Sequence, residues 1–226
     1  MRDPKIDLRD PKYHAIRNFR IIEFVDKGKR GNVFKVVDPN NGGAVYALKV
    51  VRGETKQQLS ESLNSFTSES KKAATYKELG VAHSAIIQSH PSFIVKEWIE
   101  GMRGDEWVRQ WSDERTPYDS MIASELRQLV RGLAKKGAYI GDLNAKNLIW
   151  IPPLEGQVPP FAPTIDGGAV VPAKKGWVIV DSGSTITRLS FREAMARYVA
   201  NIPRKWGKHA DERTVRKLER LLRKSQ

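Results

Sequence analysis

The sequence predicts an α+β fold with a β-rich first half and a more helical second half. Up to Ile99, short segments rich in Val, Ile, Tyr and Phe are separated by turn residues, which is typical of antiparallel strands. Beyond them, apolar residues recur at helical spacing. The chain has 226 residues and no Cys, which suits one ordinary domain or two small ones and excludes disulfides and thiolate metal sites.

The first half predicts elements in the order β-β-β-α-β-β. The segments expected to form strands are Phe19–Val25, Asn32–Val37, Ala44–Val51, Ala85–Ser89 and Phe93–Ile99. A dense run of Asp, Pro, Asn and Gly separates the second strand from the third, so the first three should form an antiparallel meander. Helical spacing predicts a helix over Ser60–Leu79, which Gly80 would end.

The second half predicts two amphipathic helices and one irregular insert. Apolar residues share one face of Tyr118–Lys136, as expected for a helix packed on a core. Residues 152–176 are rich in Pro and Gly and predict an irregular insert between short strands at Asn147–Ile151 and Trp177–Val180. Glu212–Lys224 predicts a basic helix whose leucine stripe suits either tertiary packing or a membrane surface.

The net charge and the N-terminal sequence limit the kinds of partner and the cellular compartment that we expect. The net charge of +13 favours an anionic partner, such as nucleic acid, an anionic membrane or a polyphosphate ligand. Nucleic acid is disfavoured because neither zinc-finger spacing, nor an RNA-binding aromatic motif, nor heptads accompany the charge. We expect a soluble protein made in the cytosol, since the sequence has neither a long apolar stretch nor an apolar secretion signal. Residues 1–20 repeat Arg-Asp-Pro-Lys and predict an extended arm.

A Gly-rich turn and a lysine-bearing strand are the first candidates for nucleotide chemistry. Gly28 and Gly31 lie between two predicted strands, where backbone N–H groups can approach phosphate oxygens, and Val33 follows where it would cover an adenine ring. A plain hairpin with two glycines is the commoner alternative. Lys49 lies inside an apolar strand, where a buried ammonium needs an anionic partner such as Glu69. Alternatively, Lys49 faces solvent on an alternating strand.

A second set of polar residues flanks the two short strands of the second half. Asp142 and Asn147 are five residues apart and precede one apolar strand. Asp181 closes the other strand, just before Ser182-Gly183. At this spacing the first Asp can serve as a base and the Asn as a magnesium ligand, while Asp181 provides a hard oxygen that bridges metal and phosphates.

Taken in order, these residues resemble the eukaryotic-type protein kinase superfamily. The likeness runs from Ile21 to Gly183. It implies a two-lobed fold, with a five-stranded antiparallel N-lobe over residues 21–98 and a truncated helical C-lobe over residues 99–226, preceded by the arm. It also implies that ATP and two Mg²⁺ ions bind in the cleft between the lobes.

The resemblance gives each candidate on the nucleotide side a role. Lys49 would hold the α- and β-phosphates and pair with Glu69, while Lys96 stands at the gatekeeper position. Of the hinge residues, Glu97 and Ile99 would present backbone groups to the adenine. The residues that would contact ATP are Gly28, Gly31, Val33, Lys49, Glu97 and Ile99.

The resemblance also assigns the catalytic turn. Asp142 would be the catalytic base, and Lys146 would neutralise the γ-phosphate in place of the common catalytic-loop Lys, whose position Asn144 occupies. Asn147 and Asp181 would hold Mg²⁺.

Departures from the family pattern imply a reduced kinase. Ile140 and Gly141 stand where the family has His and Arg, and loss of that Arg implies activity without activation-loop phosphorylation. Ser182 replaces the Phe of the usual Asp-Phe-Gly. The short segment after Gly183 leaves no room for most substrate-docking helices. In this respect the chain resembles small kinases among bacterial type III secreted effectors.

The sequence therefore predicts a minimal Mg-ATP-dependent Ser/Thr protein kinase, with a bacterial effector that phosphorylates a host protein as the implied setting. We expect it in the cytoplasm of the producing cell, with delivery to a host through a needle-type system. Its partners would be a protein substrate and, at the basic helix Glu212–Lys224, an acidic partner or anionic membrane. The alternatives are a small-molecule, lipid or sugar kinase and a nucleotide-binding pseudokinase scaffold.

Overall fold

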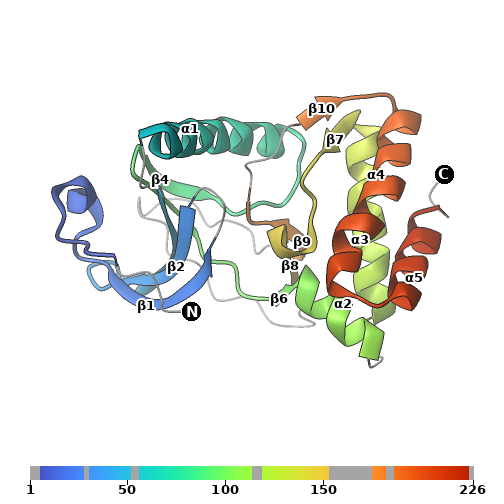
Figure 1. The fold of residues 1–226 in the computed structure, drawn as a ribbon, viewed down its shortest axis with the longest axis horizontal. Helices are drawn as coiled ribbons and strands as arrows, with labels where there is room; N and C mark the ends of the chain where they lie inside the picture. The colour runs from blue at the N-terminus through green and yellow to red at the C-terminus, as the bar shows by residue number, and fades with distance from the viewer. Residues whose placement is uncertain are drawn as a thin grey trace. The chain divides into compact units, whose positions relative to one another are not determined.

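The structure, a computed structural model, describes residues 6–27, 31–51, 56–113, 119–152, 175–181 and 186–223. The described chain is a mixed α+β protein with a five-stranded antiparallel sheet and several helices, which confirms the predicted fold class (Figure 1). It divides into two compact units. The first unit contains residues up to Ala73 together with Ser84–Trp98, and the second contains Ala74–His83 and most of the chain after Ile99.

The sheet of the first unit has the strand order β1-β2-β3-β5-β4. Its strands are β1 (Arg20–Lys27), β2 (Gly31–Asp38), β3 (Ala44–Val51), β4 (Ile86–His90) and β5 (Phe93–Glu97). The first three form the predicted meander, and Gly42 and Gly43 close the β2–β3 turn with φ of 59° and 76°, which favours glycine. The helix α1 (Lys56–Glu78) connects β3 to β4, and Gly80 ends it with φ of 57°.

The N-terminal arm covers one face of this sheet. Tyr46, Leu48 and Val50 alternate along β3 onto that face, and the short 3-10 helix η1 (Pro11–Ile16) buries Tyr13 and Ile16 in the same cluster. The prediction of an extended arm is wrong for residues 11–16. Asp10 accepts a hydrogen bond from the Lys12 N–H at 3.0 Å and starts a helical turn, which the burial of the two apolar side chains stabilises.

The second unit combines helices with two small sheets, ordered β10-β7 and β6-β8-β9. Its elements are β6 (Met102–Arg103), α2 (Gly104–Asp113), α3 (Asp119–Lys135), β7 (Ala138–Ile140), η2 (Ala145–Asn147), β8 (Leu148–Ile151), β9 (Gly176–Ile179), β10 (Ile186–Arg188), α4 (Phe191–Trp206), η3 (Gly207–His209) and α5 (Glu212–Arg223). The strands and helices predicted for this half are present. Most of the predicted insert 152–176 lies outside the described residues.

Tryptophans form the centre of the second unit. The Trp107 ring lies 4.8 Å from Trp111, 5.7 Å from Trp177 and 6.0 Å from Trp206 between centroids. Trp107 and Trp111 therefore pack against each other on one face of α2. Leu218 of α5 is fully buried in the same core, so the leucine stripe of the basic helix serves tertiary packing.

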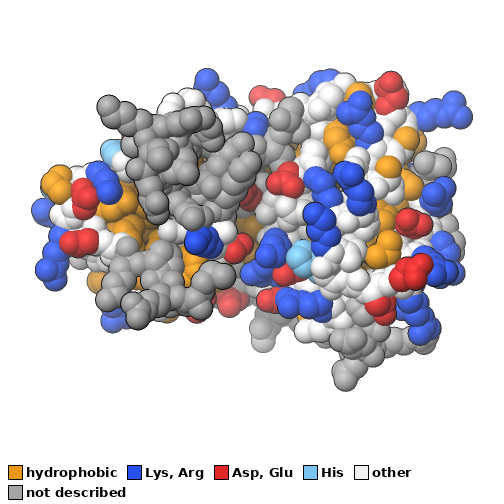
Figure 2. All heavy atoms as spheres, viewed as in Figure 1, with side chains coloured by type: hydrophobic (Ala, Val, Ile, Leu, Met, Phe, Trp, Pro, Cys, Tyr) orange, Lys and Arg blue, Asp and Glu red, His pale blue; other side chains and the backbone are white. Residues whose placement is uncertain are grey.

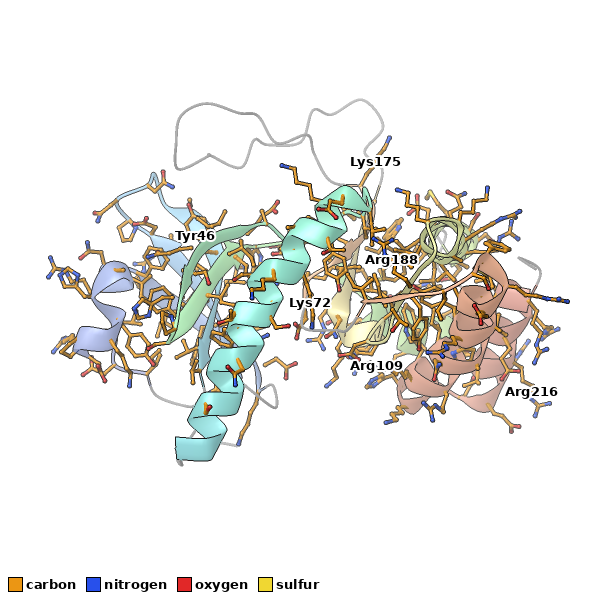
Figure 3. All side chains as sticks on the ribbon, turned by 90° about the horizontal axis from the view of Figure 1, so that it is seen from above. Tyr46, Lys72, Arg109, Lys175, Arg188 and Arg216 are labelled. Atoms are coloured by element: carbon orange, nitrogen blue, oxygen red, sulfur yellow. The ribbon has the colours of Figure 1, made fainter. Side chains whose placement is uncertain are left out.

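The charged face of α5 points away from that core. Figure 3 shows Arg216 extending outward from the helix, and its side chain is 65% exposed. In the view of Figure 2, Lys and Arg side chains gather over the part of the surface that the second unit forms. Among the helices of the described ranges, none has the length and apolarity needed to cross a bilayer.

Helix α4 has no counterpart in the sequence prediction, although its signals are present. Ser190 and Glu193 form a capping box, in which the Glu193 N–H donates to Ser190 Oγ at 3.3 Å and the Ser190 N–H donates to Glu193 Oε2 at 3.0 Å. Buried residues then recur at helical spacing: Ala194, Met195, Tyr198, Val199 and Ile202. Pro203 inside the helix disguises this pattern, because proline normally ends a helix.

Candidate functional site: a buried lysine pair and a polar catalytic turn

A buried carboxylate between two lysines is the main polar feature of the first unit. Lys49 Nζ lies 2.7 Å from Glu69 Oε2, and Lys96 Nζ lies 2.9 Å from Glu69 Oε1. The Glu69 side chain is 0% exposed, and those of Lys49 and Lys96 are 12% and 5% exposed. Such burial is costly for charged groups unless they are paired and hydrogen bonded, and here each oxygen of the carboxylate accepts one bond.

The strands and the helix bring the three charges together for simple geometric reasons. Lys49 alternates with Leu48 and Val50, so its side chain leaves the face that the arm covers and points to the opposite one. Lys96 is the cross-strand partner of Ala47, two residues from Lys49 and on the same face. The solvent-facing alternative for Lys49 is wrong, and the predicted Lys49–Glu69 contact is present.

The turn that precedes β2 is described in part. Gly28 lies outside the described residues, whereas Gly31 opens β2 and Val33 pairs with Lys49 across the strands. A Cβ added at Gly31 would lie 2.7 Å from the Val50 carbonyl oxygen and 3.3 Å from Lys49 Cγ. Gly31 is therefore required for the close approach of β2 to β3, beside the lysine that would bind phosphate.

The segment expected to act as a hinge uses part of its backbone internally. The Glu97 N–H donates to the Ala85 carbonyl at 2.9 Å, and the Glu97 carbonyl accepts from Ser84 Oγ at 2.9 Å. Both the N–H and the carbonyl of Glu97 are therefore hydrogen bonded within the first unit. Ile99 follows in a stretch without regular structure, and its side chain is buried.

In the second unit, Asp142 lies in a turn that the side-chain amides of Asn144 and Asn147 organise. Asn144 Nδ2 donates to Asp142 Oδ1 at 2.9 Å, while Asn144 Oδ1 accepts from the backbone N–H groups of Lys146 and Asn147 at 3.0 and 3.1 Å. Asn147 Nδ2 donates to both Asp142 O and Asp142 Oδ2 at 3.2 Å. Asn144, which replaces the usual Lys, thus fixes the turn and the carboxylate together, a role that spacing alone did not reveal.

The β8–β9 pair places Asp181 next to Asn147. Leu148 pairs with Ile179, and the Val180 N–H donates to the Asn147 carbonyl at 3.0 Å, one residue before Asp181. The Asn147 amide nitrogen points to Asp142, which leaves its oxygen as the ligand atom for a cation. Ser182 and Gly183 lie outside the described residues.

Lys146 is exposed at the edge of this turn, in η2. His209 lies in η3, and partial burial lowers its pKa from its ordinary value, with Lys146, Arg109 and Arg103 contributing in the same direction and Asp105 opposing them. Figure 3 shows Arg109 on the same unit. Lys146 therefore places a positive charge at the edge of the turn, which favours anionic ligands near it.

Helix α4 holds the backbone that leads into the turn. Tyr198 Oη accepts from the Ile140 N–H at 2.8 Å and donates to the Ala138 carbonyl at 3.1 Å, and Trp206 Nε1 donates to the Leu143 carbonyl at 2.9 Å. Burial raises the pKa of Tyr198 well above its ordinary value of 10.0, so it remains a hydroxyl donor at any physiological pH. These contacts come from residues about 60 positions downstream of the turn, which sequence spacing could not have identified.

Comparison with solved structures gives the fold. Neither the protein-family models nor the curated proteins searched gave a match. Rad53 (residues 1–466), in a crystal structure with AMP-PNP, is 14% identical with a TM-score of 0.52, covering 94% of this chain and 54% of that one. The Rio2 kinase from Chaetomium thermophilum is 17% identical with a TM-score of 0.57, covering 92% of this chain and 65% of that one.

The chain therefore spans between about half and two thirds of the length of these two structures. At such low identity the likeness shows the fold alone. Together with the five-stranded sheet and the helical second unit, it establishes that this chain has a protein-kinase-like fold.

Proposed function

We propose that this protein is a Mg-ATP-dependent phosphotransferase that acts on Ser or Thr hydroxyls of a protein. The observation that carries the proposal is the Asp142 turn, where Asn144 and Asn147 fix an exposed carboxylate on both of its oxygens. A carboxylate held in this way can orient an acceptor hydroxyl and accept its proton, which the positioning mechanism of phosphoryl transfer requires.

The buried lysine pair supports the nucleotide side of the proposal. Two ammonium groups, those of Lys49 and Lys96, lie beside the single carboxylate of Glu69. A polyphosphate is a suitable ligand for a cationic group in such a dry environment. Lys49, which is the more exposed of the two lysines, would bind the α- and β-phosphates of ATP.

The residues present fit Mg²⁺. Asn147 lies just before β8 and Asp181 lies two residues after β9, so both could offer an oxygen atom at the same end of this strand pair. Mg²⁺ commonly uses one or two protein ligands, with phosphates and water completing its shell. Within the described ranges, no His, Cys, Asp and Glu side chains gather into a metal cluster of three or more. When bound, Mg²⁺ would offset charge on the transferred phosphoryl group.

The first test is transfer of labelled phosphate from ATP with Mg²⁺, in buffer and in a eukaryotic cell lysate. Wild type is compared with Asp142→Ala and Asp181→Ala, and with Asp211→Asn as a matched loss of one carboxylate at the start of α5. We expect wild type and Asp211→Asn to label the same protein band, and the other two variants to label it at least about a hundredfold more slowly.

The other candidate functions make different predictions in the same experiment. A small-molecule, lipid or sugar kinase would label no protein but would consume ATP when its acceptor is supplied. A pseudokinase would show a magnesium-dependent rise in melting temperature with ATP and no turnover. Equal labelling by wild type and Asp142→Ala would contradict the role of the catalytic turn. Labelled bands in a eukaryotic lysate, and none in a bacterial lysate, would support a host protein as the substrate.

A further inference from the structure

We infer that Lys205 is a positioning residue for Asp142 and supplies a positive charge directly beside its carboxylate. The inference rests on the proposed function, because it assigns a role in phosphoryl transfer. Lys205 lies in the last turn of α4, more than 60 residues beyond the turn. The sequence motifs did not point to it.

The geometry places its ammonium on the turn. Lys205 Nζ donates a hydrogen bond to the Gly141 carbonyl oxygen and lies 3.5 Å from Asp142 Oδ1. Its side chain is 27% exposed, against 50% for Asp142, so the lysine is partly withdrawn from water while the carboxylate remains accessible to an acceptor. Both contacts are made within the second unit.

The neighbouring residue fixes the end of the helix. Trp206 is fully buried, and its Nε1 donates to the Leu143 carbonyl at 2.9 Å. Two consecutive residues of α4 therefore contact the turn. Lys205 contacts Gly141 and Asp142. Trp206 donates a hydrogen bond to Leu143. A long lysine side chain loses less freedom when its backbone is already held, which makes its contact with Asp142 more effective.

Two positions of the turn that carry cations in the kinase pattern are neutral in this chain. The residue before Asp142 is Gly141, and the residue two positions after it is Asn144. Among the described residues, Asn144 and Asn147 contribute neutral donors to the carboxylate, and Lys205 contributes a full positive charge. Hydrogen bonds and ion pairs to charged groups are stronger than neutral ones, so Lys205 should restrict the carboxylate to one orientation.

The experiment compares four variants in steady-state phosphate transfer. Lys205→Met removes the contact, Lys205→Gln keeps an amide donor without the charge, and Lys205→Arg keeps the charge. Lys208→Met is the matched control, since this exposed lysine lies three residues further along. We expect Lys205→Met and Lys205→Gln to lower kcat by about ten- to a hundredfold while KM for ATP changes by less than about threefold, because positioning errors act on the chemical step.

Rescue separates positioning from a structural role. Lys205→Arg should keep kcat within about fivefold of wild type, because a guanidinium can make the same charged contact. Lys208→Met should match wild type. In an Asp142→Asn background, Lys205→Met should lower the residual kcat by less than about twofold, since the group through which Lys205 acts is already altered. Wild type, Lys205→Met, Asp142→Asn and the double variant should also give non-additive shifts of the urea midpoint, a readout that needs no activity.

Two results would overturn the inference. One is a Lys205→Gln variant, folded by its cooperative urea transition, whose kcat equals that of wild type. The other concerns the double variant: Lys205→Met would lower kcat as much in the Asp142→Asn background as in wild type, and the two shifts of the urea midpoint would add. Failure of the proposed function looks different, because wild type itself would then transfer no phosphate to protein, and the urea midpoints alone would decide whether Lys205 and Asp142 are coupled.

Discussion

Lys96 contacts the carboxylate of Glu69 at 2.9 Å, through the oxygen that Lys49 does not use. In the kinase pattern a single lysine is expected to pair with this glutamate, and the resemblance assigns Lys96 to the gatekeeper position. Here α1 is joined to two strands of the sheet, β3 through Lys49 and β5 through Lys96. Glu69 therefore has a structural role in addition to the one expected for ATP binding.

Glu69→Gln should destabilise the protein by about 3–5 kcal/mol, because it leaves two buried ammonium groups without their carboxylate. The measurement is urea denaturation at neutral pH. Glu78→Gln, which changes an exposed glutamate on the same helix, is the control and should change stability by less than about 0.5 kcal/mol. Equal stability of the two variants would show that the contacts of Glu69 with Lys49 and Lys96 contribute little to the free energy of unfolding.

Gly31→Ala should destabilise the protein by about 1–3 kcal/mol, since its Cβ would lie 2.7 Å from the Val50 carbonyl oxygen and force β2 away from β3. The matched control is Gly132→Ala within α3, where an added Cβ meets nothing within 4 Å. That change should stabilise the helix by about 0.5–1 kcal/mol. Thermal or urea unfolding of both variants checks the opposite signs, and destabilisation by both would contradict the packing argument.

Tyr198→Phe should cost about 1–3 kcal/mol, because it leaves the buried Ile140 N–H and Ala138 carbonyl without their partner. Tyr139→Phe serves as the comparison. Its hydroxyl accepts from Asn201 Nδ2, which also donates to the Arg197 carbonyl, so removing it should cost less than about 1 kcal/mol. Since Ile140 leads directly into the catalytic turn, kcat should fall for the Tyr198 variant and remain near wild type for the Tyr139 variant.

Ser190→Ala should lower stability by about 1 kcal/mol at pH 7, and by less in acid. The Ser190 hydroxyl and N–H hold the pKa of Glu193 below its ordinary value, so their contribution is present above that ordinary pKa and is lost as pH falls through the lower folded-state pKa. Urea midpoints of wild type and Ser190→Ala at pH 7 and at about pH 3 measure this change. A difference that grows on acidification would have the wrong sign for a capping box.

Asn147→Ala should raise the Mg²⁺ concentration that gives half-maximal phosphate transfer by about tenfold or more, because it removes an oxygen ligand and the tether to Asp142. A magnesium titration at fixed ATP measures the shift. Asn40→Ala, in the β2–β3 turn of the first unit, should leave the titration unchanged. If the magnesium titration of the Asn147 variant matched that of wild type, Asn147 would not be a magnesium ligand.

Local sequence patterns were enough to predict several strands and helices and the candidate residues that they carry. Alternation in β3 predicted a lysine on one face of a strand, and helical spacing in α1 predicted a carboxylate able to meet it. The spacing of Asp142 and Asn147 likewise predicted one polar turn, because both residues lie within a few positions of each other and short segments have few possible conformations.

The tertiary structure decided which distant groups complete these sites. Lys96 meets Glu69 because β5 pairs with β3, and Tyr198, Lys205 and Trp206 meet the turn because α4 packs beside it. The arm folds into η1 because the sheet offers an apolar face to Tyr13 and Ile16. These contacts join residues tens of positions apart, and they depend on burial and strand pairing, which act through space and leave no periodic signal in the sequence.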